Sequence, residues 1–249
     1  MVPLKSRHEI ELMRKSGRLA RRILMEMGKL AREGLTTLDL DRYARRRARD
    51  AGATCSFLNY RGYPAAICTA LNDVVVHGIP NDVPLKNGDI LGIDFATHLN
   101  GFVGDTAWTF AIGTVSPEKQ HVMRVTEQAL YEGIKQAKPG NRMGDISYAI
   151  QSYAERHGCS VVRALVGHGV GRKLHEPPPV PNYGEPGTGL KLKVGMTLAI
   201  EPMIIFGNDP EVYQLEDGWT VLSRSGQPSA HFEHTVAILS DGPDILTEG

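Results

Sequence analysis

The sequence predicts an α+β fold in which two helix–helix–sheet halves are related by a pseudo-twofold axis around a central antiparallel sheet. Residues 34–52 align without a gap on residues 140–158, at an offset of 106 positions. Each segment follows a helical pattern and precedes a strand-like pattern, and four pairs are identical: Gly34 and Gly140, Asp39 and Asp145, Ala48 and Ala154, Gly52 and Gly158. Helix starts and stops look alike in any chain, but four identities at one offset favour an internal duplication. We therefore expect one domain over residues 1–249, with pseudo-repeats at about 9–113 and 117–240.

Composition excludes several classes of protein. The chain has 249 residues, enough to bury a large core, and its 28 basic residues balance its 28 acidic residues, so no overall positive field attracts nucleic acid. An arginine-rich run at 42–49 is interpreted as a solvated helix face, with RNA or ribosome contact as the alternative. The three cysteines lack CxxC spacing, which favours a reducing compartment over a disulfide framework. No signal-peptide core or bilayer-length apolar run is present, so we expect a cytoplasmic protein without membrane contact.

The first half begins with two predicted helices. Ser6 and Glu9 form a capping box before apolar residues at helical spacing, which continue to about residue 32. A second helix is expected from Thr36 to about residue 51, where Gly52 would end it. The patterns that follow are a Tyr- and Gly-rich loop at 57–65 and short strands at 66–70 and 74–76.

The second half repeats this order. Ser116, Pro117 and Glu118 supply an N-cap, a first-turn proline and an acidic first turn, and Pro139-Gly140 breaks the helix that they start. The elements expected after it are a helix at 145–157, a strand at 160–166, a glycine-rich loop, a proline-rich loop at 177–189, and strands at 196–201, 219–222 and 231–239.

Residues 89–113 predict a β-hairpin that turns at Asn100-Gly101, since this dipeptide favours the positive φ angles of a tight turn. In that register Asp94 and Asp105 lie on the same face as diagonal neighbours, about 7–8 Å apart. Two carboxylates at this spacing can bind a metal pair, whose ions lie about 3.5–4 Å apart in hydrolytic sites. The alternatives are that Asp105 belongs to a turn with Gly104, or that a bulge at Gly104 changes the register.

Further carboxylates lie inside apolar strand patterns, where an unpaired charge is costly to bury. Asp94 follows Ile93, Glu201 lies in LAIEPM, and Glu233 lies in HFEHTVAI, a run that also carries His231 and His234. These runs contain no Lys or Arg, so a metal centre is favoured over salt bridges to arginines from elsewhere in the chain. Four carboxylates and one imidazole suit Mn²⁺, Fe²⁺, Co²⁺ or Zn²⁺, and two such ions balance the four negative charges.

Three other histidines lie in the runs VVVHGIP and VGHGVGRKLHEPP. His168 lies between two glycines, which let the backbone approach a cluster closely, and it is the expected imidazole ligand. His77 and His175 are interpreted as outer groups that donate to a developing oxyanion, with surface-loop histidines as the alternative. His234 is left out because it would point away from Glu233 in a regular strand.

Taken together, these runs resemble the type I methionine aminopeptidases, metallopeptidases of the M24 family. The motifs NYRGYP, VVVHGIP, IDFATHLNGFVGDT, GHGVG with HEPP, IEPM and FEHT occur in that family's order and spacing over nearly the whole chain. The resemblance implies the pita-bread fold, one catalytic domain and the removal of the initiator methionine from nascent chains when the second residue is small. It also implies attack on the first peptide bond by water activated at two divalent ions.

The resemblance implies a ligand role for five positions. Asp94 would bind one ion, His168 and Glu201 the other, and Asp105 and Glu233 would bridge both.

It implies substrate roles for further positions. His77 would assist the scissile amide, His175 would bond the substrate carbonyl, and Glu201 is also a candidate proton shuttle. Positions matching the methionine pocket are Tyr60, Tyr63, Cys68 and Trp219. Positions matching a Na⁺ or K⁺ site built mostly from backbone carbonyls are Asn72, Val74 and Ser229.

Leu174 and Phe57 depart from the family pattern, where an aromatic and a small residue are common, so side-chain preference is less defined than the chemistry. Two rival interpretations stay open. One is an Xaa-Pro aminopeptidase or creatinase-like enzyme, which usually carries an additional N-terminal domain. The other is a metal-free binding protein on the same scaffold. We expect a monomer that acts on a peptide or nascent-chain N-terminus.

Overall fold

The structure is a computed structural model that describes residues 2–248. Its helices are α1 (Arg7–Leu30), α2 (Thr37–Asp50), α3 (Pro117–Gln136), α4 (Met143–Arg156) and the 3₁₀ turn η1 (Tyr60–Gly62). Its strands are β1 (Thr54–Cys55), β2 (Cys68–Leu71), β3 (Val74–Val76), β4 (Ile90–Leu99), β5 (Phe102–Ala111), β6 (Cys159–Val161), β7 (Gly167–Gly169), β8 (Glu176–Val180), β9 (Thr197–Ile200), β10 (Met203–Phe206), β11 (Val212–Gln214), β12 (Val221–Ser223), β13 (Ser229–His231), β14 (His234–Leu239) and β15 (Gly242–Ile245).

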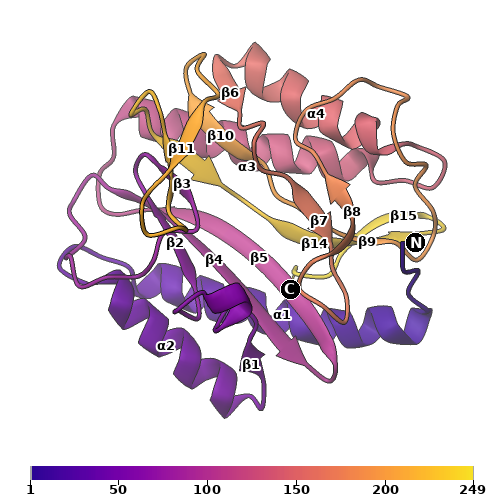
Figure 1. Ribbon diagram of the computed structural model, residues 1–249, viewed down its shortest axis with the longest axis horizontal. Helices are drawn as coiled ribbons and strands as arrows, with labels where there is room; N and C mark the ends of the chain where they lie inside the picture. The colour runs from indigo at the N-terminus through magenta and orange to yellow at the C-terminus, as the bar shows by residue number, and fades with distance from the viewer. Residues whose placement is uncertain (1, 249) are drawn as a thin grey trace.

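Two helix pairs enclose the strands from opposite sides. Figure 1 shows α1 and α2 along one side of the molecule and α3 and α4 along the other, with the strands between them. The strands form four small antiparallel sheets, in the orders β1-β4-β2 with β5 on β4, β13-β10-β6, β11-β12-β3 and β15-β14-β9-β7-β8. The four predicted helices and the predicted strand segments at 66–70, 74–76 and 89–113 are therefore confirmed, although the central sheet is divided into several short pieces and contains further strands.

The two halves start their second helices in the same way. Helices α2 and α4 begin and end 106 residues apart, and in each the carboxylate of Asp39 or Asp145 accepts from the backbone N–H of the residue that precedes the helix. Gly34 and Gly140, which precede these helices, both have positive φ, 83° and 95°. This correspondence supports the proposed duplication.

Hairpin β4–β5 has the predicted register. Leu99 pairs with Phe102 and Asp94 with Ala107, so Asn100-Gly101 is the turn and no bulge forms at Gly104. Gly104 instead permits close packing, because a Cβ built there would lie 2.3 Å from the backbone nitrogen of Gly17 in α1.

Four predicted elements of the second half are wrong in type or extent. The strand expected at 160–166 ends at Val161, and the glycine- and proline-rich segments expected as loops form the paired strands β7 and β8. Glycines around His168 allow this pairing, since a Cβ at Gly167 or Gly169 would lie 2.4 Å from a carbonyl oxygen of a neighbouring strand. The strand expected at 231–239 is interrupted between His231 and His234.

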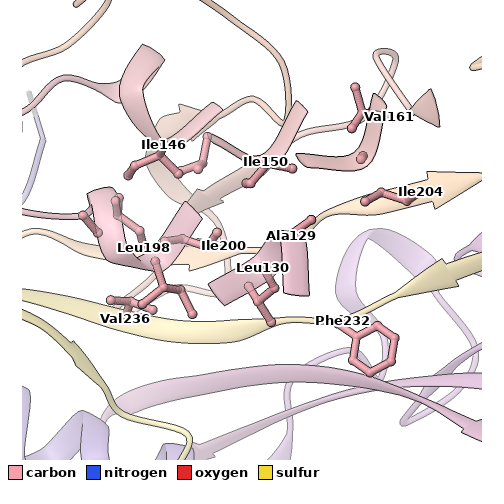
Figure 2. Close-up of a cluster of buried hydrophobic side chains, with 14 of the residues drawn as sticks. Ala129, Leu130, Ile146, Ile150, Val161, Leu198, Ile200, Ile204, Phe232 and Val236 are labelled. Carbon is pink, nitrogen blue, oxygen red and sulfur yellow. The ribbon is translucent and has the colours of Figure 1, made fainter. Parts of the chain in front are cut away.

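Helices α3 and α4 cover the second half through one apolar cluster. Figure 2 shows side chains of these helices, such as Leu130 and Ile150, facing Leu198, Ile200 and Val236 from the strands. Each of these side chains is fully buried, and burial of one such residue stabilises the fold by about 1.5–3 kcal/mol. A comparable cluster joins α1 and α2 to β4 and β5.

Hydrogen bonds near Glu233, at the break between β13 and β14, join the two halves. Glu233 donates its N–H to the Ala107 carbonyl at 2.9 Å, and Thr106 Oγ1 donates to the Glu233 carbonyl at 2.9 Å. Asp105 donates its N–H to Thr235 Oγ1 at 3.1 Å, and that hydroxyl donates to the Asp105 carbonyl at 2.8 Å. These bonds hold the two acidic residues side by side.

Between residues 2 and 248, none of the helices has both the length and the apolar character that crossing a membrane would require.

Candidate metal centre

The five predicted ligands come from five separate places in the fold and meet at one pocket. Asp94 lies on β4, Asp105 on β5, His168 on β7, Glu201 directly after β9, and Glu233 between β13 and β14. The pocket that they line has a volume of about 290 Å³.

The donor atoms are close enough to share ions. Atoms of Asp105, His168 and Glu233 lie within 4.8 Å of one another. His168 Nε2 lies 3.4 Å from Glu201 Oε1 and 3.8 Å from Asp105 Oδ2. Such separations fit ligands that each bind one ion at about 2.0–2.2 Å. Asp94 lines the same pocket but lies outside the two groups of donors that are mutually this close.

The hydrogen-bond inventory of the pocket fits a metal pair. Asp94 Oδ1, Asp105 Oδ1 and Glu233 Oε1 are buried without a hydrogen-bond partner, and buried polar atoms in proteins are normally paired. Among residues 2–248, no Lys or Arg forms an ion pair with any of the four carboxylates, which argues against the salt-bridge alternative. Divalent ions bound in the pocket would supply the missing partners of these carboxylate oxygens.

Burial and mutual repulsion oppose ionisation of three of these groups. Burial, with the neighbouring carboxylates, raises the pKa values of Asp94 and Glu233, and burial raises that of Asp105 to about 7. Glu201 differs, because contact with His231 and the nearby His168 outweigh its burial and lower its pKa. A bound divalent cation would favour the charged form of every member of the set.

His168 is held in the tautomer that metal binding needs. Its Nδ1–H donates to the Gly169 carbonyl at 2.9 Å, which leaves the Nε2 lone pair facing Asp105 and Glu201.

The two outer histidines also line the pocket. His77 has a positive φ of 61°, uncommon for a residue with a side chain, and burial lowers its pKa. Burial and the neighbouring His168 lower the pKa of His175 to about 4, so this imidazole is neutral at pH 7. His175 lies against His168, with ring centroids 4.0 Å apart, and stacks on Tyr60 at 5.1 Å.

The positions matched to a methionine pocket lie on the same cavity. Tyr60, Tyr63, Cys68 and Trp219 all line it. The Tyr63 hydroxyl is directed away from solvent and contacts the Ile67 and Gly78 carbonyls at 3.0 and 2.9 Å, and its ring meets Trp219 edge to face.

Asn72, Val74 and Ser229 do not line this cavity. The Ser229 N–H donates to the Asn72 carbonyl at 2.8 Å, and Lys119 Nζ donates to Asn72 Oδ1 at 2.7 Å. The structure thus brings Asn72 and Ser229 together away from the carboxylates.

Sequence reasoning assigned no role to His231. Its Nε2 is buried without a well-aligned hydrogen bond and lies 3.2 Å from Glu201 Oε2, and one of its ring nitrogens lies within 4.8 Å of donor oxygens of Glu201 and Glu233. The spacing of two between His231 and Glu233 was the signal that could have indicated it. His234, left out of the site, bonds Thr247 Oγ1 through Nδ1 at 2.8 Å.

A buried set of carboxylates and imidazoles on this paired helix–strand scaffold defines a metal-dependent hydrolase. The model of Metallopeptidase family M24 matches residues 11–240. The methionine aminopeptidase of Clostridium perfringens is 49% identical over 247 residues, covering 99% of each chain, and methionine aminopeptidase 1 of Bacillus subtilis is 46% identical with the same coverage. The crystal structure of methionine aminopeptidase from Rickettsia prowazekii superposes with a TM-score of 0.98 at 43% identity, covering 100% of both chains. The chain belongs to metallopeptidase family M24, and the expected pita-bread fold is confirmed.

Proposed function

We propose that this protein is a metal-dependent aminopeptidase that removes an N-terminal methionine when the second residue is small. The observation that carries the proposal is the set of unpartnered, buried carboxylate oxygens from separate strands around one cavity. Similarity to methionine aminopeptidases over the full chain supports the choice of substrate.

We assign five residues to two divalent ions, which could be Mn²⁺, Fe²⁺, Co²⁺ or Zn²⁺. Asp94 would hold one ion, His168 and Glu201 the other, and Asp105 and Glu233 both. When bound, such ions lower the pKa of water and polarise a carbonyl group.

The remaining chemistry belongs to side chains of the chain itself. Glu201, whose pKa is lowered, is ionised at neutral pH and can accept the proton that the attacking water loses. The neutral His175 can donate an N–H to the developing oxyanion, and His77 can bond the scissile amide or its leaving nitrogen.

The cavity supports binding of an unbranched apolar side chain. Tyr63, Cys68 and Trp219 supply its wall, together with Leu174 and Phe57, the two positions that depart from the family pattern. A flexible thioether suits such an apolar, partly aromatic surface.

Release of methionine from Met-Ala-Ser tests the proposal. Purified protein loaded with Mn²⁺, Fe²⁺ or Co²⁺ should cleave this peptide and leave Ala-Pro-Ala intact. Asp105→Ala and Glu233→Ala should each abolish release while the circular dichroism spectrum remains that of a folded chain. Absence of cleavage with all three metals, or preference for Ala-Pro-Ala, would refute the assignment.

We further propose that Asn72, Val74 and Ser229 form a Na⁺ or K⁺ site and that the enzyme is a cytosolic monomer acting on nascent chains.

The surface that best supports ribosome contact is a groove along α1 rather than the arginine run of α2. Its cationic lining is Lys15, Arg18, Arg21, Arg22 and Lys29. In α2, Arg45 and Arg47 are already paired with Asp41 and Glu26. Cosedimentation with ribosomes, weakened by Arg18→Ala with Arg22→Ala, would test this contact.

A further inference from the structure

His231 is a buried histidine at the edge of the candidate metal centre, and its Nε2 has no well-aligned hydrogen-bond partner. The residue ends β13 and is only 2% exposed. Thr109 holds its backbone, since the Thr109 hydroxyl donates to the His231 carbonyl at 2.8 Å and the His231 N–H donates to Thr109 Oγ1 at 3.1 Å. The ring therefore has little freedom to move away from the site.

The ring nitrogen faces one particular oxygen of the metal centre. Nε2 lies 3.2 Å from Glu201 Oε2, whereas the other oxygen of that carboxylate, Oε1, lies 3.4 Å from His168 Nε2. Glu201 is thus flanked by two imidazoles, one on each oxygen. Phe232, the next residue, packs in the opposite direction, edge to face on Trp108, and is seen among the apolar side chains of Figure 2.

We infer that His231 is a positioning residue that holds Glu201 through Oε2 while Oε1 is presented to the ion shared with His168. The inference rests on the proposed function only in requiring that the centre bind metal.

The placement of the two imidazoles favours this role over direct ligation. Both imidazoles lie within 4.8 Å of carboxylate donor oxygens, His168 with Asp105 and Glu233, and His231 with Glu201 and Glu233. They differ because the Gly169 carbonyl accepts the His168 Nδ1–H, which fixes the tautomer that a ligand needs. His231 lies on the far side of the Glu201 carboxylate, and its closest contact is the oxygen that His168 does not face. An outer N–H donor to a ligating carboxylate fixes its orientation, and loss of such donors typically weakens metal binding about 10- to 100-fold.

Three variants separate the donor function from a packing effect. His231→Leu removes the N–H, whereas His231→Gln keeps an amide N–H at the same reach along the side chain. His234→Leu is the matched control, because it removes a histidine that is equally buried and lies three positions away, but whose partner is Thr247.

Calorimetric titration with Mn²⁺ should resolve the weaker of two binding events. We expect His231→Leu to weaken the binding of one Mn²⁺ ion about 10- to 100-fold. His231→Gln should bind both ions with an affinity within about threefold of that of the unsubstituted protein. His234→Leu should lower thermal stability without changing the affinity for Mn²⁺. The inference is overturned if His231→Leu binds both ions normally, if His234→Leu weakens binding equally, or if His231→Gln is as weak as His231→Leu.

X-ray absorption of the dizinc protein counts imidazole ligands without any substitution, and so decides the matter even if His231→Leu does not fold. One imidazole for two zinc ions is expected, from His168, and a second imidazole would make His231 a ligand and refute the positioning role. Neither measurement uses a peptide. A protein that binds two ions but releases no methionine would therefore refute the proposed function and leave this inference standing.

Discussion

Replacing Asp105 by asparagine should stabilise the metal-free protein at pH 8 and at the same time abolish its activity. Asp105 is 2% exposed, and burial raises its pKa to about 7 from the usual 3.8. Each tenfold change in proton affinity corresponds to about 1.4 kcal/mol, so keeping this carboxylate ionised at pH 8 costs the metal-free fold about 4 kcal/mol. Asparagine has nearly the same shape and carries no charge, so it removes that cost.

The dependence on pH identifies the cause. The folded protein holds the Asp105 proton up to about pH 7, whereas the unfolded chain loses it near pH 4. The stability associated with this proton is therefore complete below about pH 4 and is lost as the pH rises toward 7. We expect the advantage of Asp105→Asn to be about 4 kcal/mol at pH 8 and less than about 2 kcal/mol at pH 5.

Urea denaturation in the presence of EDTA measures both values, with Asp82→Asn on an exposed loop as the control, expected to change stability by less than about 0.5 kcal/mol. Adding Mn²⁺ should reverse the order, because only the aspartate is a strong ligand. An advantage that does not change between pH 5 and pH 8, or a variant less stable than the parent at pH 8, would refute the reasoning.

Three shorter predictions concern the scaffold and its metal. Lys5→Met should destabilise the protein by about 3–5 kcal/mol in thermal denaturation, because Lys5 and Glu176 form a buried ion pair at 2.5 Å and the carboxylate would lose its partner; a loss below 1 kcal/mol would contradict this. Gly104→Ala should cost more than about 3 kcal/mol, since its Cβ would meet the Gly17 backbone, whereas Gly52→Ala, in open space at φ 71°, should cost only about 1–2 kcal/mol. Equal losses would disprove the steric argument. Dialysis against a chelator should abolish methionine release and added Mn²⁺ should restore it; full activity in the chelated protein would exclude a metal role.

Local signals in the sequence predicted the helices and the central hairpin well. Capping boxes at Ser6 and Thr36 define helix starts, and the Asn100-Gly101 turn fixes the register that aligns Asp94 and Asp105. Both signals lie within a few residues of the structure that they specify. The gathering of the ligands could be predicted only because unpaired carboxylates in apolar strands are too costly to leave without a counterion.

Elements that depend on distant partners were missed. Residues 167–169 and 176–180 contain Gly and Pro, which weaken strand propensity, yet they form β7 and β8 because β7 pairs with β9 and β8 pairs with β7. Nothing within these segments indicates that partner.

The role of His231 was also not predicted, because it depends on contacts with residues that are distant in the sequence. Glu233, two residues away, was predicted to be a ligand because an unpaired carboxylate beside an apolar strand is costly to bury. A neutral histidine can be buried there at a lower cost. The role of His231 exists only because the chain departs from strand geometry between β13 and β14, where Thr106 and Thr109 on β5 bind its backbone and that of Glu233. Two further bonds, between Asp105 and Thr235, bring Asp105 of the first half beside Glu233 of the second. The second half therefore gathers Glu201, His231 and Glu233 by itself, and the hydrogen bonds between the halves add Asp105 to this candidate metal centre.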